Sequence, residues 1–194
     1  MSGKRGIYSK VAGNFCVAIV LIGVVLFSFI GCEKKEAVKA RPQRITEPCE
    51  VYDKLPGDIG KRVDVNFGNK IKLLGMTIKK LPKDQLSVTY YWQLLNELDT
   101  YNAVFFHLTD KDNKILFANY HDICQRRPFS ELKEKFIKEP SVINIPQSAK
   151  GREVYVKVGI FSIEPDIGRL KVVSAGGLST DDSNTRAIVE RIAL

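Results

Sequence analysis

Hydrophobic and polar residues alternate in short runs over the C-terminal two thirds of the chain. In the run 86–94 the even-numbered residues from Val88 to Leu94 are apolar or aromatic and fall on one face. In the run 152–162 the even-numbered residues from Val154 to Ile160 do the same, with Tyr155 and Lys157 opposite. A period of two is typical of β-strands that bury one face. We therefore expect a strand in each run.

Turn-forming residues separate the other β-rich runs. These runs are 62–67, 70–80, 102–109, 115–120 and 169–175, while 186–193 fits a strand or a helix. Seven or eight short strands with no long helical period predict an all-β fold, an antiparallel β-sandwich of the immunoglobulin-like type. Only 128–138 interrupts the pattern. It fits a short amphipathic helix with Ser130 as N-cap, or an irregular crossover.

An uncharged segment from Val11 to Cys32 precedes the strands, and Lys4, Arg5 and Lys10 stand before its apolar part. Basic residues followed by an apolar stretch are typical of a secretory signal. As a helix, residues 15–30 would reach ~24 Å, whereas residues 11–31 would just cover the ~30 Å hydrocarbon layer. A cleaved signal and an uncleaved transmembrane anchor therefore both stay open.

The segment ends in Phe29-Ile30-Gly31-Cys32, which resembles the lipobox of bacterial lipoproteins. Gly31 and Cys32 fit the pattern, and Phe29 stands where a Leu is usual. The resemblance implies cleavage after Gly31, a diacylglycerol on the Cys32 thiol and acylation of the new amine, for example with palmitate. Several acyl chains hold a protein stably on a bilayer. Glu33, where an Asp would favour the inner membrane, tilts the expectation toward the outer membrane.

Three parts follow: a signal peptide (1–31), a lipidated Cys with a charged, proline-containing tether (32–61), and one domain (62–194). The later half of the tether is expected to begin docking on the domain. The whole chain carries +8, and removal of the three leader charges leaves +5. Because an exported chain does not meet nucleic acid routinely, we expect a mixed charged surface and no nucleic-acid partner.

Cys49 and Cys124 are the two cysteines left after the leader residue Cys16 and the lipid site Cys32. An even pair in an exported protein is compatible with a disulfide. A bridge between them would contribute ~3–4 kcal/mol, and the sequence leaves it open whether they are close enough to form one.

Catalytic and metal-binding patterns are sparse. The chain has no nucleophile elbow, phosphate loop or paired Cys-x-x-Cys, so we assign no catalytic residue, no cofactor and no enzymatic activity. His107 stands among apolar strand residues and is interpreted as a semi-buried, hydrogen-bonded histidine. His121, Asp122 and Cys124 are the densest set of metal-ligand types, but strand geometry puts His121 on the other face, so we assign no metal site.

Aromatic residues suggest a binding surface. Tyr90 and Trp92 are interpreted as core residues, which leaves Tyr91 and Tyr101 as surface candidates together with Arg126 and Arg127. Aromatic faces flanked by hydrogen-bonding groups suit a glycan or the surface of a partner protein.

Short motifs along 62–194 resemble, in their order, a periplasmic β-sandwich module that forms the C-terminal appendage of bacterial membrane-bound glycosyltransferases of the mannosyltransferase type. Pro128 to Leu132 stands where that module usually has Pro-Thr-Ser-x-Trp. The resemblance implies a sandwich fold and no established activity. The motifs are Asn66-Phe67-Gly68, Leu73-Leu74-Gly75, Val88 to Gln93, Val104 to Leu108, Ile145-Pro146 and Val158 to Phe161.

The sequence therefore predicts a membrane-anchored lipoprotein of the bacterial envelope that faces the periplasm or the exterior. Its partners are the lipid bilayer, through acylated Cys32, and an envelope glycan or a membrane protein bound by a non-catalytic module. The alternatives are an enzyme acting on envelope polysaccharide and a structural stabiliser of a membrane complex on an uncleaved transmembrane anchor.

Overall fold

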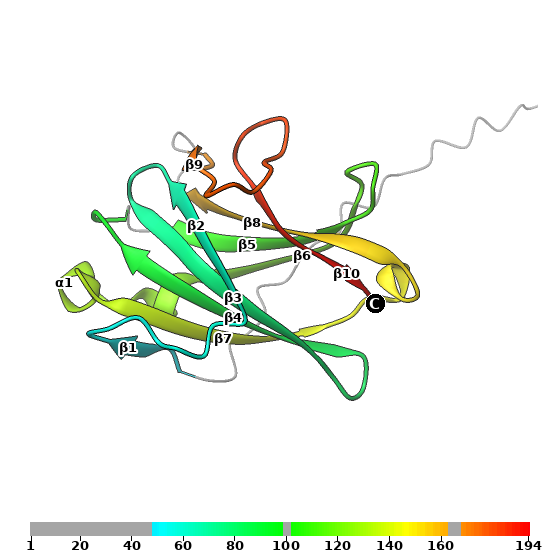
Figure 1. The fold of residues 1–194 in the computed structure, drawn as a ribbon, viewed down its shortest axis with the longest axis horizontal. Coiled ribbons are helices and arrows are strands. Elements are labelled where there is room, and N and C mark those ends of the chain that lie inside the picture. Colours follow the sequence, from blue (N-terminus) through cyan, green and yellow to red (C-terminus); the bar gives the residue numbers. More distant parts are fainter. Residues whose placement is uncertain (1–47, 99–101, 163–167) are drawn as a thin grey trace, which may run out of the picture. The chain divides into compact units, whose positions relative to one another are not determined.

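The computed structural model describes residues 48–98, 102–162 and 168–194. Over these residues the chain forms ten strands in two antiparallel sheets and very little helix (Figure 1). Neither sheet closes on itself. The helical parts are α1 (Phe129–Leu132) and two short 3₁₀ turns, η1 (Ile123–Arg126) and η2 (Gln147–Ala149).

The larger sheet has the strand order β1-β7-β4-β3-β2-β9. Its long central strands, β3 and β4, form a hairpin that turns at residues 82–84. The bounds of its strands are β1 Glu50–Tyr52, β2 Lys61–Phe67, β3 Ile71–Leu81, β4 Gln85–Leu94, β7 Phe136–Asn144 and β9 Val172–Ser174.

The smaller sheet has the strand order β10-β8-β5-β6. All eight residues of β5 are buried, so this strand is covered on both faces. The bounds are β5 Asn102–Thr109, β6 Ile115–Asp122, β8 Glu153–Ser162 and β10 Ala187–Ala193.

One hydrophobic core joins the inner faces of the two sheets. In β4 every second residue from Leu86 to Leu94 is buried, and in β8 the same holds from Val154 to Ile160. These are the residues that the alternation assigned to the inner face. The prediction of a mostly β fold built from antiparallel strands is confirmed, and 187–193 is a strand and not a helix.

The strand count over the described residues is ten, and two of these strands were not expected. Strand β1 lies in the segment assigned to the tether, and its three residues pair with residues 136–138 of β7. Strand β7 begins inside the interrupted segment 128–138, where the helix is limited to α1. The sequence predicted a helix N-cap at Ser130, but Ser130 lies within α1, whose N-cap residue is Pro128. Pro128 has no backbone N–H to donate, and its φ of −56° suits the start of a helix.

Two features of the sequence lie outside the described residues. One is the N-terminal segment with the expected apolar helix and Cys32, and the other is Tyr101. Within the residues that the structure does describe, no helix has the length and apolar character needed to cross a membrane.

Candidate functional site

A pocket of about 230 Å³ opens where β4 and β6 end and β5 begins. We call it the arginine pocket. Its floor is apolar and mostly aliphatic, because Leu94, Ile123 and Leu132 belong to the hydrophobic core, and Leu98 and Phe129 pack on that core while remaining partly exposed. The lining residues are Leu94, Glu97, Leu98, Asn102, Ile123, Arg126, Arg127, Pro128, Phe129 and Leu132.

The wall of the pocket contains an unusual turn. Cys124, Gln125 and Arg126 have φ values of 46°, 56° and 62°, three consecutive residues in the left-handed region. Non-glycine residues rarely adopt this conformation, which costs of order 1–3 kcal/mol each and persists only where the surroundings impose it. Backbone strain of this kind is concentrated at binding and catalytic sites.

Two contacts of Cys124 hold this turn. Its sulfur is bonded to that of Cys49, with the two Cα atoms 5.2 Å apart. Its backbone N–H donates a 2.7 Å hydrogen bond to Oε1 of Glu139. The bridge joins the residue before β1 to the turn after β6, so the pocket wall is attached to the opposite sheet.

Glu139 is fully buried in β7, and its carboxylate accepts hydrogen bonds from residues of two other elements, β4 and η1. Besides the Cys124 N–H, it accepts a 2.9 Å hydrogen bond from Nε1 of Trp92, and Nε2 of His121 lies 3.5 Å away. Tyr90 stacks on Trp92 with ring centroids 5.5 Å apart, and burial together with the Glu139 charge raises the pKa of Tyr90 well above its usual value. Tyr90 and Trp92 are thus core residues, as the alternation indicated.

Two guanidinium groups stand at the rim. Nε of Arg126 lies 2.8 Å from Oδ2 of Asp122, which orients that side chain. Arg127 follows directly and is exposed. An aliphatic floor beside guanidinium donors can hold an apolar side chain and a neighbouring carboxylate together.

Tyr91, predicted as a surface residue, is not one, because only 1% of it is exposed. It lies on the opposite face of β4 from the core residues Tyr90 and Trp92, and the segment 58–60 covers it. The Tyr91 hydroxyl donates to the carbonyl oxygen of Asp58 at 3.2 Å. Gly75 leaves room for this segment, since a Cβ there would lie 2.3 Å from a methyl carbon of Ile59.

The structure therefore does not bring Tyr91 together with the arginines. Tyr91 lines a separate polar pocket of about 280 Å³, together with Thr77, Thr89 and Lys138. Arg126 and Arg127 line the arginine pocket. Tyr101 lies outside the described residues.

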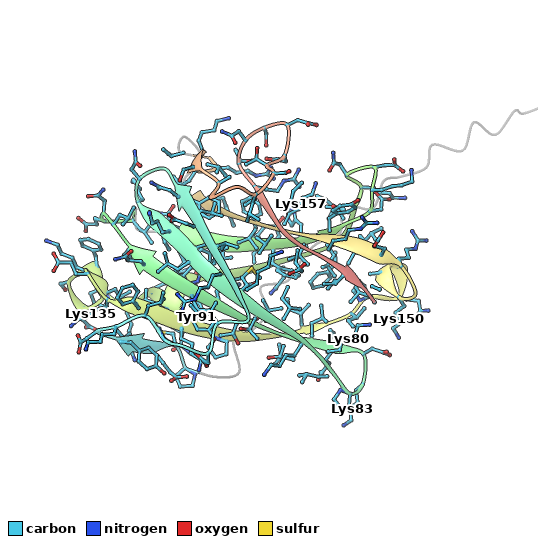
Figure 2. The ribbon with its side chains drawn as sticks, viewed as in Figure 1. Lys80, Lys83, Tyr91, Lys135, Lys150 and Lys157 are labelled. Atoms are coloured by element: carbon cyan, nitrogen blue, oxygen red, sulfur yellow. A yellow bond between two sulfur atoms is a disulfide. The ribbon has the colours of Figure 1, made fainter. Side chains whose placement is uncertain are left out.

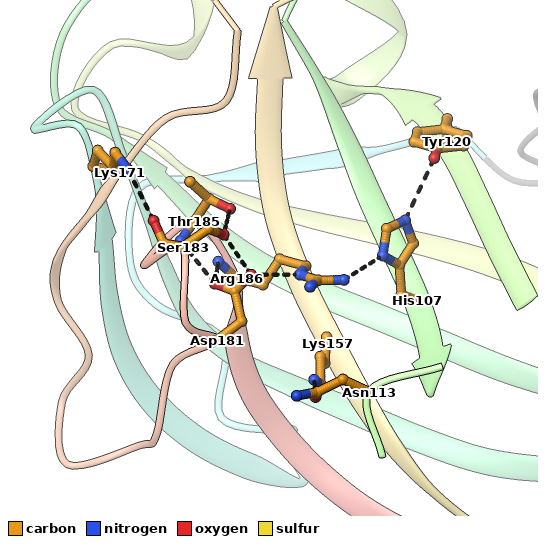
Figure 3. Close-up of polar contacts among 9 residues, drawn as sticks. All are labelled: His107, Asn113, Tyr120, Lys157, Lys171, Asp181, Ser183, Thr185 and Arg186. Carbon is orange, nitrogen blue, oxygen red and sulfur yellow. Dashed lines mark hydrogen bonds and ion pairs between the residues drawn. The ribbon is translucent and has the colours of Figure 1, made fainter. Parts of the chain in front are cut away.

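A second polar cluster lies on the outer face of the smaller sheet (Figure 3). Asp181 accepts hydrogen bonds from the backbone N–H groups of Thr185 and Arg186, both at 2.9 Å, and from Nε of Arg186 and the Ser183 hydroxyl. Burial alone would raise the pKa of Asp181, but these donors outweigh it and hold the pKa below its ordinary range. The cluster fixes the loop before β10 against the sheet.

His107 and Lys157 extend this cluster inward. Nδ1 of His107 lies 3.1 Å from Nη1 of Arg186, and its Nε2 lies 3.4 Å from the Tyr120 hydroxyl. Nζ of Lys157 donates to Oδ1 of Asn113, and burial followed by the Arg186 charge lowers the pKa of Lys157. His107 is hydrogen-bonded as predicted, but it is fully buried and not semi-buried. Lys157 is buried as well, although the alternation marked its face as polar.

No group of three or more His, Cys, Asp or Glu side chains that could hold a metal ion occurs among the described residues. Of the predicted ligand types, Cys124 is in the disulfide and His121 faces Glu139 in the core.

Sequence reasoning missed Glu139 and the aliphatic floor of the pocket. The only signal for Glu139 was the break in alternation at 139–141, which reads as the absence of a strand. The floor residues come from separate segments of the chain, so no local pattern marked them as one site. We compared the chain with protein-family models, curated proteins and solved structures, and none of the three comparisons finds a match. The resemblance of residues 62–194 to the glycosyltransferase appendage therefore stays a prediction.

Proposed function

We propose that this protein is a membrane-anchored lipoprotein of the bacterial cell envelope whose domain is a non-catalytic module that binds a partner protein in the arginine pocket. Cys32 carries the lipid after cleavage of residues 1–31, and residues 62–194 form the domain. The two sheets with one shared core support a β-sandwich, which we propose to be immunoglobulin-like. Strand β1 makes the last part of the tether a docked edge of this domain.

The strained turn at the arginine pocket carries the proposal. A disulfide and the buried carboxylate of Glu139 hold Cys124 in a left-handed conformation. Gln125 and Arg126 follow in the same conformation, and Arg126 lies at the pocket rim. The pocket floor is made of leucine, isoleucine and phenylalanine side chains. Sugar rings prefer broad aromatic faces, and Phe129 is the single aromatic side chain among the residues that line the pocket. The other apolar lining side chains are aliphatic or proline and suit an apolar side chain of a protein. The guanidinium groups then select an acidic residue beside the apolar one.

The test uses the lipidated full-length protein, purified from envelopes in mild detergent. It is presented to peptides that carry an apolar residue next to Asp or Glu, and to an array of neutral and acidic glycans. We expect retention of the peptides, a loss of at least tenfold in affinity for Arg127→Glu, and a smaller loss for Arg127→Lys, which keeps the charge but not the bidentate geometry.

Arg62→Glu is the matched control, because Arg62 is an exposed arginine of β2 outside the pocket. It should bind as the wild type does. Equal binding by wild type and Arg127→Glu would show that the pocket is not the site. Retention of glycans that depends on Arg127 would keep the pocket and replace the protein partner with a sugar.

A further inference from the structure

The end of the domain farthest along β4 from the arginine pocket has a different character. We call it the hairpin end, made of residues 80–84, 110–115 and 145–152. Two contacts join the first and third of these loops: the Ile145 N–H donates to the carbonyl of Asp84 at 2.8 Å, and Nζ of Lys150 lies 2.6 Å from Oδ2 of Asp84. The Ser148 hydroxyl donates to the carbonyl of Leu116, the residue directly after the second loop, at 3.1 Å. The three loops form one continuous surface.

Positive charge dominates this surface. Its three loops contain six Lys and Arg residues and three Asp residues. Asp84 is paired with Lys150 and Asp112 with Lys111. No carboxylate of the described residues lies within ion-pair distance of the remaining cations, which are Lys80, Lys83, Lys114 and Arg152, all of them exposed. Figure 2 shows Lys80, Lys83 and Lys150 at this end and Lys135 at the other.

Exposed apolar side chains occur at the same end. Among the described residues three large hydrophobic side chains are exposed: Leu81 at 36%, Ile115 at 43% and Val173 at 55%. Leu81 lies between Lys80 and Lys83 along the chain, and Ile115 follows Lys114. Apolar side chains flanked by lysines suit a bilayer interface, where the apolar group enters the boundary of the acyl region and the ammonium groups meet lipid phosphates.

We propose that the hairpin end rests on the surface of the membrane that holds the anchor, with its lysines on anionic phospholipid headgroups and with Leu81 and Ile115 in the interface. This inference rests on the proposed anchoring at Cys32. Anchoring makes the contact intramolecular, so a weak surface is sufficient. The fifteen residues between Cys32 and Pro48 can span at most ~50 Å, which exceeds the ~33 Å length of a ten-residue strand such as β4.

The consequence is an orientation. Strand β4 starts at Gln85, beside the hairpin turn, and ends at Leu94, in the floor of the arginine pocket. With the hairpin end on the bilayer, the pocket is held one strand length above the lipid, where a partner protein can reach it. Figure 1 shows the turn between β3 and β4 at one end of the domain and α1, whose residues line the pocket, at the other.

The test places a photo-crosslinking amino acid at Leu81 or at Val173 of the lipidated full-length protein, reconstituted in vesicles of phosphatidylethanolamine with phosphatidylglycerol or in vesicles of phosphatidylcholine alone. Val173 is the matched control, since it is a more exposed apolar residue on β9. Mass spectrometry measures lipid adducts. We expect at least fivefold more adduct from Leu81 than from Val173 in the anionic vesicles, and a decline of this excess at 0.5 M salt because of screening.

Charge reversal provides the second readout. The combined change of Lys80, Lys83 and Lys114 to Glu should bring the Leu81 adduct down to the Val173 level, whereas Lys135→Glu should leave it unchanged. Equal adducts from both positions, or equal Leu81 adducts in anionic and zwitterionic vesicles, would overturn the orientation. Absence of the wild-type protein from floated vesicles of either kind would instead overturn the anchoring, and the inference with it.

Discussion

The imidazole of His107 lies between a guanidinium and a phenol, with no exposed surface. Because the guanidinium of Arg186 can only donate, Nδ1 must accept, which leaves the proton of a neutral imidazole on Nε2. Burial first, and then the Arg186 charge, lowers the pKa of His107 to about 4. Arg169, Lys157 and Asp181 also face the ring, and only Asp181 opposes this shift.

This environment predicts how stability depends on pH. The unfolded chain takes up a proton on His107 near pH 6.5, the folded chain only near pH 4. The contribution of neutral His107 to the free energy of unfolding is therefore fully present above pH 6.5. It is lost as the pH falls toward 4, by up to about 3 kcal/mol. We expect the free energy of unfolding from urea denaturation to decrease between pH 7 and pH 4.5, and His107→Gln to decrease less.

Tyr120→Phe is the control, because it removes a hydrogen-bond partner of His107 and leaves its burial intact; it should retain the slope. Asp181 stabilises the fold throughout this window, because its folded pKa lies below the unfolded value of 3.8 and its contribution is lost only as the pH falls below that value. An identical slope in wild type and His107→Gln would contradict the assignment.

At the scale of elements, the disulfide and Glu139 connect a three-residue strand, a turn and β7. Strand β1 has only three paired residues and would be a weak edge alone. The bridge from Cys49 fixes the residue before it, and Cys124 at the other end of the bridge is held by Glu139.

Removing the bridge should therefore affect stability and binding together. We expect Cys49→Ala with Cys124→Ala to lower the free energy of unfolding by ~3–4 kcal/mol, measured by urea denaturation, because the link spans 75 residues. Peptide affinity at the arginine pocket should fall in conditions where the variant is still folded, since the turn loses one of its two constraints. A reductant should change the wild type and not the variant. Two free thiols in the intact wild-type protein, seen by mass spectrometry without reductant, would contradict the bridge.

Eight of the strands were predictable because each is a short β-rich run between turn residues, with clear alternation in β4 and β8. Strand β7 was not, since Glu139 and Ser141 occupy inward positions and Pro140 lies between them. The carboxylate is tolerated there because Trp92 and the Cys124 N–H donate to it. Proline is tolerated because β1 pairs only with 136–138, and no other strand of the described residues pairs with that edge of β7.

At the scale of the whole molecule, the proposal is of a protein held by one lipidated residue, with a pocket at one end of its domain and a basic surface at the other. In this proposal, the six Lys and Arg residues of the hairpin end, against three Asp residues, face the anionic bilayer. The leader lies outside the described residues. Its proposed cleavage and the lipidation of Cys32 are therefore tested by mass spectrometry.

The intact mass of the membrane-extracted protein provides this test. We expect wild type to correspond to residues 32–194 with a diacylglycerol and one further fatty acid, and Cys32→Ser to retain residues 1–31 without lipid, because processing needs the thiol. Retention of residues 1–31 without lipid in the wild type would indicate an uncleaved transmembrane anchor and contradict the lipoprotein.

Sequence alone determined the strands with strong alternation, the inward faces of β4 and β8, and the core positions of Tyr90 and Trp92. These are local properties, because a period of two and flanking turn residues act within one segment. Arg126 and Arg127 were also identified from the sequence, because they are adjacent residues in a segment expected to be a loop.

Tertiary structure decided what covers the second face of each strand. Tyr91 is buried by residues 58–60 and His107 by the loop that carries Asp181 and Arg186, both remote in the chain. The floor of the arginine pocket likewise comes from Leu94, Ile123 and Leu132, which converge only when the sheets pack. Burial depends on which distant segment packs on a strand face, and the alternation along one strand does not identify that segment.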